Sequence, residues 1–390
     1  MNVEVNPLVA GLEESATEIV DNEIKRMKRS GVKDIVSLGV GEPYFDTPEF
    51  IKQAAIRSLE AGNTKYQPTF GDLDLRKAIQ EKLLRENQVH SELEDIMVTP
   101  GAKFALFLAF QALISPGDKV AILDPSWVSH ACIPQLMGAE LLRVETVESE
   151  GYQPDLEKVE AALNQKPKCI LLNSPCNPTG AVYSPDTIRK ISKMAQDNGT
   201  LVISDEIYES LLYEGEAFSP ASEFDNVFTV NGFSKRYAMT GWRLGYASGP
   251  HALMEQIKKI YQHSASCVTA FAQAGALEAL TNPACTEVTK AMVDQFSRNR
   301  DMMMESINGS EHLHCVSPKG AFYCFVSYDK PVKSLDLAKD LLQSSHLATV
   351  HGGAFGLGGE NHLRLSYATR EDDVIEGLRR LNSYFEQTGN

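Results

Sequence analysis

Short apolar segments that alternate with helical segments are the feature that most limits how this chain can fold. Between about residues 95 and 250, strands are predicted at 96–99, 119–123, 168–173, 201–204, 227–231 and 244–248. Their sequences, from IMVT to LGYAS, are almost wholly apolar, as expected of strands buried on both faces of a sheet. Strands that alternate with helices predict an α/β fold with a mainly parallel central sheet flanked by helices.

The segment SPDTIRKISKMAQDNG is the best-marked helix between two of these strands. Ser184 is suited to the N-cap, Pro185 to the first helical position and Gly199 to the stop beyond the last turn. Ile188 and Ile191 repeat at helical spacing on one face. The segment is therefore predicted to be the crossover helix of a βαβ unit.

The two ends of the chain have a different pattern. Residues 11–30 and 288–309 are predicted as helices, alternating segments such as AFYCFVSY follow Pro318, and a last helix is predicted from Asp372 to Phe385. We therefore expect two domains, a large one at 48–287 and a smaller α+β domain built from 1–47 and 288–390.

Composition narrows the classes of partner. The formal net charge of −15 opposes binding to a phosphate backbone, so no nucleic-acid partner is expected. The seven cysteines include no CxxC pair, so neither a disulfide framework nor a metal site is expected. The apolar run from Phe104 to Phe110 is too short to span a bilayer, and MNVEVNPLVAGLEE lacks the regions of a secretory signal. We expect a protein of the cytoplasm with no membrane partner.

Candidate site residues follow the predicted strands, because ligands of open α/β sheets bind at the carboxyl ends of the strands. In chain order they are Gly101, Ala102 and Lys103, then Trp127, Asn177, Asp205, Tyr208, Ser234, Lys235 and Arg243. Each has an ordinary alternative when taken alone: a tight turn for the glycine, a core position for the tryptophan, a buried ion pair or helix cap for Asp205, and a solvated side chain for either lysine.

Together the candidates form a chemical set. A glycine at a strand-to-helix turn and Arg243 suit a phosphate, Trp127 suits a flat ring, and Asp205 suits a protonated ring nitrogen. A desolvated lysine near other cations has a lowered pKa, which makes the amine of Lys235 a nucleophile. An amine, an acid and a phosphate cradle are what pyridoxal phosphate requires.

The sequence at this point resembles the class I aminotransferases of the pyridoxal-phosphate fold type I, most closely the prokaryotic-type aspartate aminotransferases. The similarity runs from SLGVGEPYFDTP and TKYQPTFG through NSPCNPTGAVY, ISDEIYE and SKRYAMTGWRLGY to HLRLSYA, which is nearly the whole chain. It implies that Lys235 joins the cofactor and moves the proton, that Asp205 binds the ring nitrogen, and that Tyr208 and Asn177 bind the ring oxygen.

The resemblance also assigns the remaining contacts. Gly101, Ala102, Ser234 and Arg243 hold the phosphate, with Lys103 in the same turn, and Tyr66 reaches it from the partner subunit of a homodimer whose active sites lie at the interface. Arg364 binds the substrate α-carboxylate beside Gly41, Asn177 and Trp127, although the alternation around Arg364 also fits a solvated sheet residue. Lys103 and Ser15, in GAK and ESAT, bind a distal carboxylate.

The implied function is transfer of an amino group from an L-amino acid, aspartate or a related one, to a 2-oxo acid by a ping-pong mechanism. Three departures from the family pattern, Tyr44, His351 and the segment HSASCVT, are expected to line the pocket and alter the amino donor. The alternatives are a lyase on the same scaffold (β-elimination or decarboxylation), an aminotransferase for aromatic or other amino acids, and a cofactor-sensing regulator, which the acidic chain disfavours.

Overall fold

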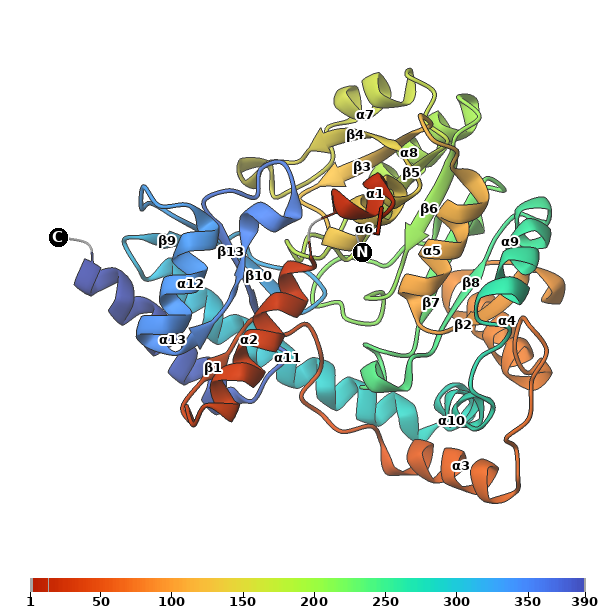
Figure 1. The fold of residues 1–390 in the computed structure, drawn as a ribbon, viewed down its shortest axis with the longest axis horizontal. Coiled ribbons are helices and arrows are strands. Elements are labelled where there is room, and N and C mark those ends of the chain that lie inside the picture. The colour runs from red at the N-terminus through yellow and green to blue at the C-terminus, as the bar shows by residue number, and fades with distance from the viewer. Residues whose placement is uncertain (1–2, 13, 389–390) are drawn as a thin grey trace.

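A seven-stranded sheet forms the centre of the larger part of the molecule in the computed structural model, which describes residues 3–12 and 14–388 (Figure 1). The strand order is β2-β8-β7-β6-β5-β3-β4. The strands are β2 (Ile96–Thr99), β3 (Lys119–Asp124), β4 (Glu140–Glu145), β5 (Cys169–Asn173), β6 (Leu201–Asp205), β7 (Val227–Gly232) and β8 (Gly245–Ser248).

The predicted mainly parallel α/β fold is confirmed. Strands β4, β3, β5, β6 and β7 pair in parallel, whereas β8 pairs antiparallel with both β7 and β2. The connection from β7 to β8 contains no long helix, so it cannot carry the chain back to the other end of the sheet as a parallel pairing would need. The edge strand β4 was not among the predicted strands.

Helices cover both faces of this sheet. One apolar core joins the sheet to α4 (Leu73–Asn87), α5 (Ala102–Leu113), α9 (His251–Ser264) and α10 (Ala270–Thr281). A second core joins it to α7 (Leu156–Leu163) and α8 (Pro185–Asp197). The remaining helices of this part are α3 (Glu49–Glu60) and α6 (Val128–Leu136).

Helix α8 begins and ends as its sequence predicts. The Ser184 side chain accepts a hydrogen bond from the Thr187 backbone N–H, and Pro185 is the first helical residue. Gly199, just beyond the helix, has a φ of 70°, which costs a glycine little. The helix connects β5 to β6, neighbouring parallel strands, and is thus the predicted crossover.

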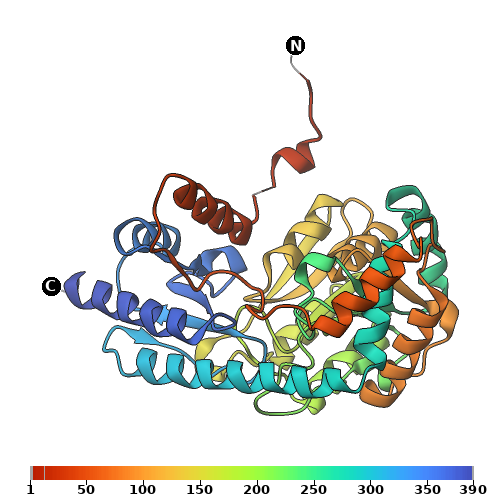
Figure 2. The same ribbon diagram turned by 90° about the horizontal axis from the view of Figure 1, so that it is seen from below.

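The second, smaller unit contains elements from both ends of the chain (Figures 1 and 2). Its antiparallel sheet has the order β12-β13-β10-β9, and β1 pairs in parallel with β11. The strands are β1 (Val36–Ser37), β9 (Leu313–His314), β10 (Tyr323–Tyr328), β11 (Leu347–Ala348), β12 (Val350–His351) and β13 (His362–Ser366). The helices are α2 (Ala16–Arg29), α11 (Ala284–Asn308), α12 (Ser334–Ser345) and α13 (Glu371–Thr388). Helix α1 (Pro7–Ala10) lies instead near α6 of the larger part.

The expected division into a large domain at 48–287 and a smaller domain at 1–47 and 288–390 stays a prediction. The expected boundary at 287 falls inside α11, a long helix that runs from the larger part along the smaller one in Figure 2. No helix among the described residues is long and apolar enough to cross a membrane. Nor does the described part of the chain contain a group of three or more metal-binding side chains.

Candidate active site

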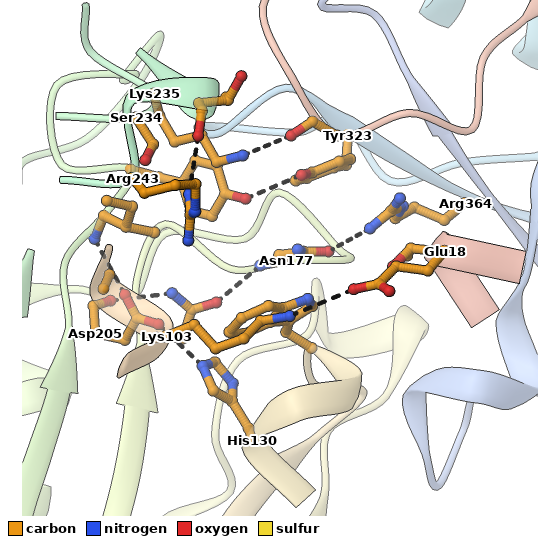
Figure 3. A pocket seen from close by; sticks show the side chains of 18 residues that line it. Glu18, Lys103, His130, Asn177, Asp205, Ser234, Lys235, Arg243, Tyr323 and Arg364 are labelled. Carbon is orange, nitrogen blue, oxygen red and sulfur yellow. Dashed lines mark hydrogen bonds and ion pairs between the residues drawn. The ribbon is translucent and has the colours of Figure 1, made fainter. Parts of the chain in front are cut away.

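A cavity of about 390 Å³ lies at the carboxyl ends of β5, β6 and β7, where residues of the smaller unit also reach it (Figure 3). It is lined by Thr17, Glu18, Gly41, Ala102, Lys103, Trp127, His130, Asn173, Asn177, Asp205, Ile207, Tyr208, Ser234, Lys235, Thr240, Arg243, Tyr323 and Arg364. Most of the predicted site residues are therefore gathered in one place, although they are spread over more than half of the sequence.

Lys235 follows β7 and directs its amine into this cavity. The Nζ atom donates a hydrogen bond to the Gly41 carbonyl oxygen at 2.5 Å. Burial lowers the pKa of Lys235 from 10.5 to about 8; the charges of Arg364 and Arg243 act in the same direction, and the charge of Glu42 opposes them. The neutral, nucleophilic form of the amine is thus accessible near neutral pH.

Asp205 ends β6 and is 3% exposed. One carboxylate oxygen accepts a hydrogen bond from the Ile207 backbone N–H at 3.2 Å, and the other lies 3.0 Å from His130 Nε2. The Asn173 side chain donates to the Asp205 carbonyl oxygen at 3.0 Å. The contacts with Ile207 and His130 fix this buried carboxylate in one orientation. A fixed orientation suits a group that binds one particular atom of a ligand.

A cluster of donors forms at the N-terminus of α5. Gly101, just before this helix, has a φ of 83°, and a Cβ atom there would lie 2.4 Å from Arg243 Nη2. Only glycine therefore allows the guanidinium so close to the turn. Ala102 and Ser234 line the same end of the cavity, and Arg243 Nη1 donates to the Thr240 carbonyl oxygen at 2.9 Å. Helix N–H groups, a hydroxyl and a guanidinium together suit a phosphate.

Arg364, on β13, is a buried cation without a carboxylate partner among the described residues. Its side chain is 1% exposed and donates to Asn177 Oδ1 at 3.1 Å and to the Gly39 carbonyl oxygen at 2.7 Å. Its Nε atom has no hydrogen-bond partner within the described ranges, and burial lowers the pKa of Arg364. Since an unpaired buried charge is costly, this guanidinium is prepared to receive an anion.

Tyr208 and Tyr323 connect the amine and this guanidinium. Their hydroxyl oxygens lie 2.9 Å apart, and the Arg364 guanidinium lies 4.4 Å from the centre of the Tyr323 ring. Burial raises the pKa of the Tyr208 hydroxyl well above its ordinary value, so Tyr208 stays a neutral hydrogen-bond donor.

Trp127 and Lys103 form the opposite wall of the cavity. The Lys103 ammonium lies 5.0 Å from the centre of the Trp127 ring and 3.9 Å from a carboxylate oxygen of Glu18 on α2. The first contact is a cation–π interaction and the second an ion pair. The side chain of this cation is 44% exposed, in contrast to the buried Arg364, and in Figure 3 it reaches toward Glu18, which lies beside Arg364.

Three predicted site residues lie outside the lining of the cavity: Gly101, which only adjoins it through Ala102, Tyr66 and Ser15. Tyr66 is 90% exposed, and Ser15, just before α2, has its hydroxyl 2.9 Å from that of Thr17. The roles predicted for all three stay predictions.

The three family departures, expected to line the pocket, are also absent from the lining. Tyr44 is 41% exposed and packs on Phe45, His351 lies at the end of β12, and His263 at the start of HSASCVT is exposed.

His130, Tyr323, Asn173, Thr17 and Glu18 line the cavity but were not predicted to do so. Asn173 had a usable signal, since it is the last residue of a predicted strand. His130 lies within a helix, and the other three come from segments that the sequence does not connect to the sheet.

Comparison with known proteins identifies the family of the chain. The family model described as aminotransferase class I and II matches residues 33–381. The chain belongs to this family. The probable aspartate/prephenate aminotransferase of Aquifex aeolicus is 41% identical over 388 residues, which covers 97% of this chain and 98% of the relative.

Solved structures of aminotransferases have the same fold. The structure of the aspartate aminotransferase from Thermus thermophilus with maleate has a TM-score of 0.94 at 39% identity, and covers 98% of this chain and 100% of that one. The alanine aminotransferase from Pyrococcus furiosus has a TM-score of 0.93 at 30% identity, with 98% and 100% covered. The expected family and fold are confirmed, and the protein is an aminotransferase.

Proposed function

We propose that this aminotransferase holds pyridoxal phosphate in the cavity and moves the amino group of an L-amino acid, aspartate or a close relative, to a 2-oxo acid. The observation that carries the proposal is the buried Lys235 amine, with a pKa of about 8, in the same cavity as the buried Asp205 carboxylate. The amine can join the cofactor, and the carboxylate can bind its ring nitrogen.

The residues present fit the cofactor. The turn at Gly101, with Ala102, Ser234 and Arg243, would hold its phosphate, and Trp127 would stack on its ring. Asp205 would bind the ring nitrogen, while Tyr208 and Asn177 would bind the ring oxygen. The backbone of Gly101 approaches Arg243 more closely than a side chain would permit, so donors from two elements meet at this turn.

The protein's own groups divide the remaining work. When bound, pyridoxal phosphate supplies an electron sink that stabilises negative charge at the substrate Cα. Lys235 Nζ takes the proton from this carbon and returns it, as a neutral amine can near pH 8. Arg364 binds the α-carboxylate and so turns the Cα–H bond toward Lys235. Asp205, oriented by His130, keeps a proton on the nitrogen that it binds.

The amino donor is proposed from the cations in the cavity. A substrate whose α-carboxylate lies on Arg364 would direct a distal carboxylate toward Lys103. Aspartate has this second carboxylate, and several relatives are named aspartate aminotransferases. Others are named aspartate/prephenate aminotransferases, so a ring-bearing acceptor is the second candidate.

A homodimer is proposed because Tyr66, in the segment between α3 and α4, is 90% exposed in the single chain. In a dimer this side chain would reach the partner's cofactor phosphate. Mixing a Tyr66→Ala variant with a Lys235→Ala variant should then restore up to roughly a quarter of wild-type activity, because half of the dimers would contain one intact site. No gain on mixing would place Tyr66 outside the active site.

The seven free cysteines fit a reducing compartment, and we infer that the protein works in the cytoplasm.

The test of the function is a single half-reaction. Purified protein loaded with pyridoxal phosphate is mixed with one amino acid at a time, without a 2-oxo acid, and the cofactor absorption band is followed. Aspartate should convert the cofactor stoichiometrically to its aminated form and release one 2-oxo acid. Release of ammonia with continued turnover from one amino acid alone would indicate the lyase instead.

A further inference from the structure

The environment of Lys103 is unusual for a cation that is to bind a substrate. Lys103 is at the start of α5, and its ammonium already has an anion, the Glu18 carboxylate at 3.9 Å, and an aromatic face, Trp127 at 5.0 Å. Both partners line the cavity, and Figure 3 shows the ion pair at its edge. The place where a distal carboxylate would bind is thus occupied by a carboxylate of the protein.

The charges around the cavity make this pairing specific. Its described lining contains four permanent or readily protonated cations, Lys103, Lys235, Arg243 and Arg364, and two carboxylates, Asp205 and Glu18. Asp205 is buried at the far end with His130. Glu18 is therefore the one acid of this lining within reach of Lys103.

We propose that Glu18 is a specificity-determining residue, an internal counter-ion that takes the place of the substrate's distal carboxylate on Lys103. The proposal rests on the proposed function, since it assumes that Lys103 faces the substrate side chain. A dicarboxylic amino acid displaces Glu18 from Lys103 and must overcome its repulsion. An amino acid with an uncharged side chain leaves the pair in place.

The consequence is a site open to two classes of substrate. A lone cation in a binding site discriminates strongly against substrates that leave it unpaired. Because Glu18 already satisfies Lys103, an uncharged or aromatic side chain meets no such penalty. The cost falls on dicarboxylates, which face a second negative charge beside the cation.

The Glu18 side chain is placed to move aside. It is 72% exposed, in the first turn of α2, and no other ion pair or hydrogen bond of its side chain is present among the described residues. An ion pair this exposed and this long is weak, so a substrate carboxylate can replace it.

The experiment measures binding of two unreactive acids to the cofactor-loaded enzyme by calorimetry at low ionic strength. Succinate carries the distal carboxylate, and 3-phenylpropionate carries an uncharged ring. Glu18→Gln should tighten succinate by about three- to tenfold and leave 3-phenylpropionate within about twofold. Glu23→Gln is the matched control, because it removes the same charge from α2 at a residue paired with Arg26, and it should change neither constant.

Two further results complete the test. Lys103→Met should weaken succinate and abolish the gain from Glu18→Gln, since the gain depends on the cation. Unchanged succinate binding in Glu18→Gln, or equal tightening by Glu23→Gln, would overturn the proposal. A different result would instead contradict the proposed dicarboxylate function. In that result the wild-type enzyme binds 3-phenylpropionate but not succinate, and the Glu18→Gln variant does not bind succinate either.

Discussion

His130 Nε2 lies 3.0 Å from a carboxylate oxygen of Asp205, and the two side chains are 1% and 3% exposed. The other ring nitrogen of His130 has no hydrogen-bond partner among the described residues. Among the described residues the ring therefore forms its side-chain hydrogen bond through Nε2 alone, with Asp205. His130 serves to hold the carboxylate in one orientation, and it does so from α6, outside the sheet that carries Asp205.

Replacing His130 by Phe should lower kcat by roughly 5- to 30-fold, which corresponds to about 1–2 kcal/mol for one lost hydrogen bond to a charged group. The fold should persist, because a ring of similar size fills the site. Steady-state kinetics with aspartate and circular dichroism measure the two effects. Activity equal to wild type would mean that the other contacts of Asp205 suffice to orient it.

The stability of the apoprotein should reveal the low pKa of Lys235. Its folded pKa of about 8 lies below its ordinary value of 10.5, so the unfolded chain binds more protons between these two values. Below pH 8 the folded protein is destabilised by the full free-energy cost of burying a charged amine, and above pH 10.5 this cost is absent. The free energy of unfolding therefore rises between these two pH values. The rise is on the order of 3 kcal/mol.

Lys235→Met removes the titrating group, so the difference in unfolding free energy between wild type and variant should change with pH in this interval only. Urea unfolding at a series of pH values, at one protein concentration, measures it. A difference that stays constant from pH 7 to pH 11 would show that the amine is not desolvated in the folded protein.

Lys82, on α4, and Glu209 form a buried ion pair. Lys82 is 2% exposed and also donates to Asn87 at 2.7 Å, while Glu209 accepts from Asn87 and from Asn231 on β7. Lys82→Met should destabilise the apoprotein by about 3–5 kcal/mol, because it leaves a carboxylate buried without its cation.

Lys77, on the same helix, provides the control for this variant. Its pair with Asp74 is exposed, so Lys77→Met should change the unfolding free energy by less than about 1 kcal/mol. Adding Glu209→Gln to Lys82→Met should restore part of the loss. Equal, small effects of Lys82→Met and Lys77→Met would contradict the assignment of a buried pair.

The sequence predicts the parts of the site that depend on local signals. Asp205 and Lys235 follow apolar strands, and the neighbouring ends of such strands meet at one edge of a sheet, so their meeting could be foreseen. Helix α8 was located by Ser184 and Gly199, whose capping roles act within a few residues. Strand β4 escaped detection because ELLRVE is an edge strand with partly exposed positions and no apolar run.

Contacts between distant segments could not be foreseen in this way. His130 meets Asp205 across 75 residues, Arg364 meets Asn177 across 187, and Glu18 reaches Lys103 from the N-terminal helix. No local pattern distinguishes these residues from ordinary helical or strand positions. The packing of α6 against the sheet brings His130 to Asp205, and the packing of the smaller unit against the larger part brings Arg364 and Glu18 to the cavity.

The central claim is that the Lys235 amine carries the cofactor. Its most direct test is to load the protein with pyridoxal phosphate, reduce it with borohydride and map the modified peptide by mass spectrometry. The predicted result is one modified residue, Lys235, within the segment SKRYAMTGWR. Modification of Lys103 or of any other lysine in its place, with Lys235 unmodified, would contradict the account.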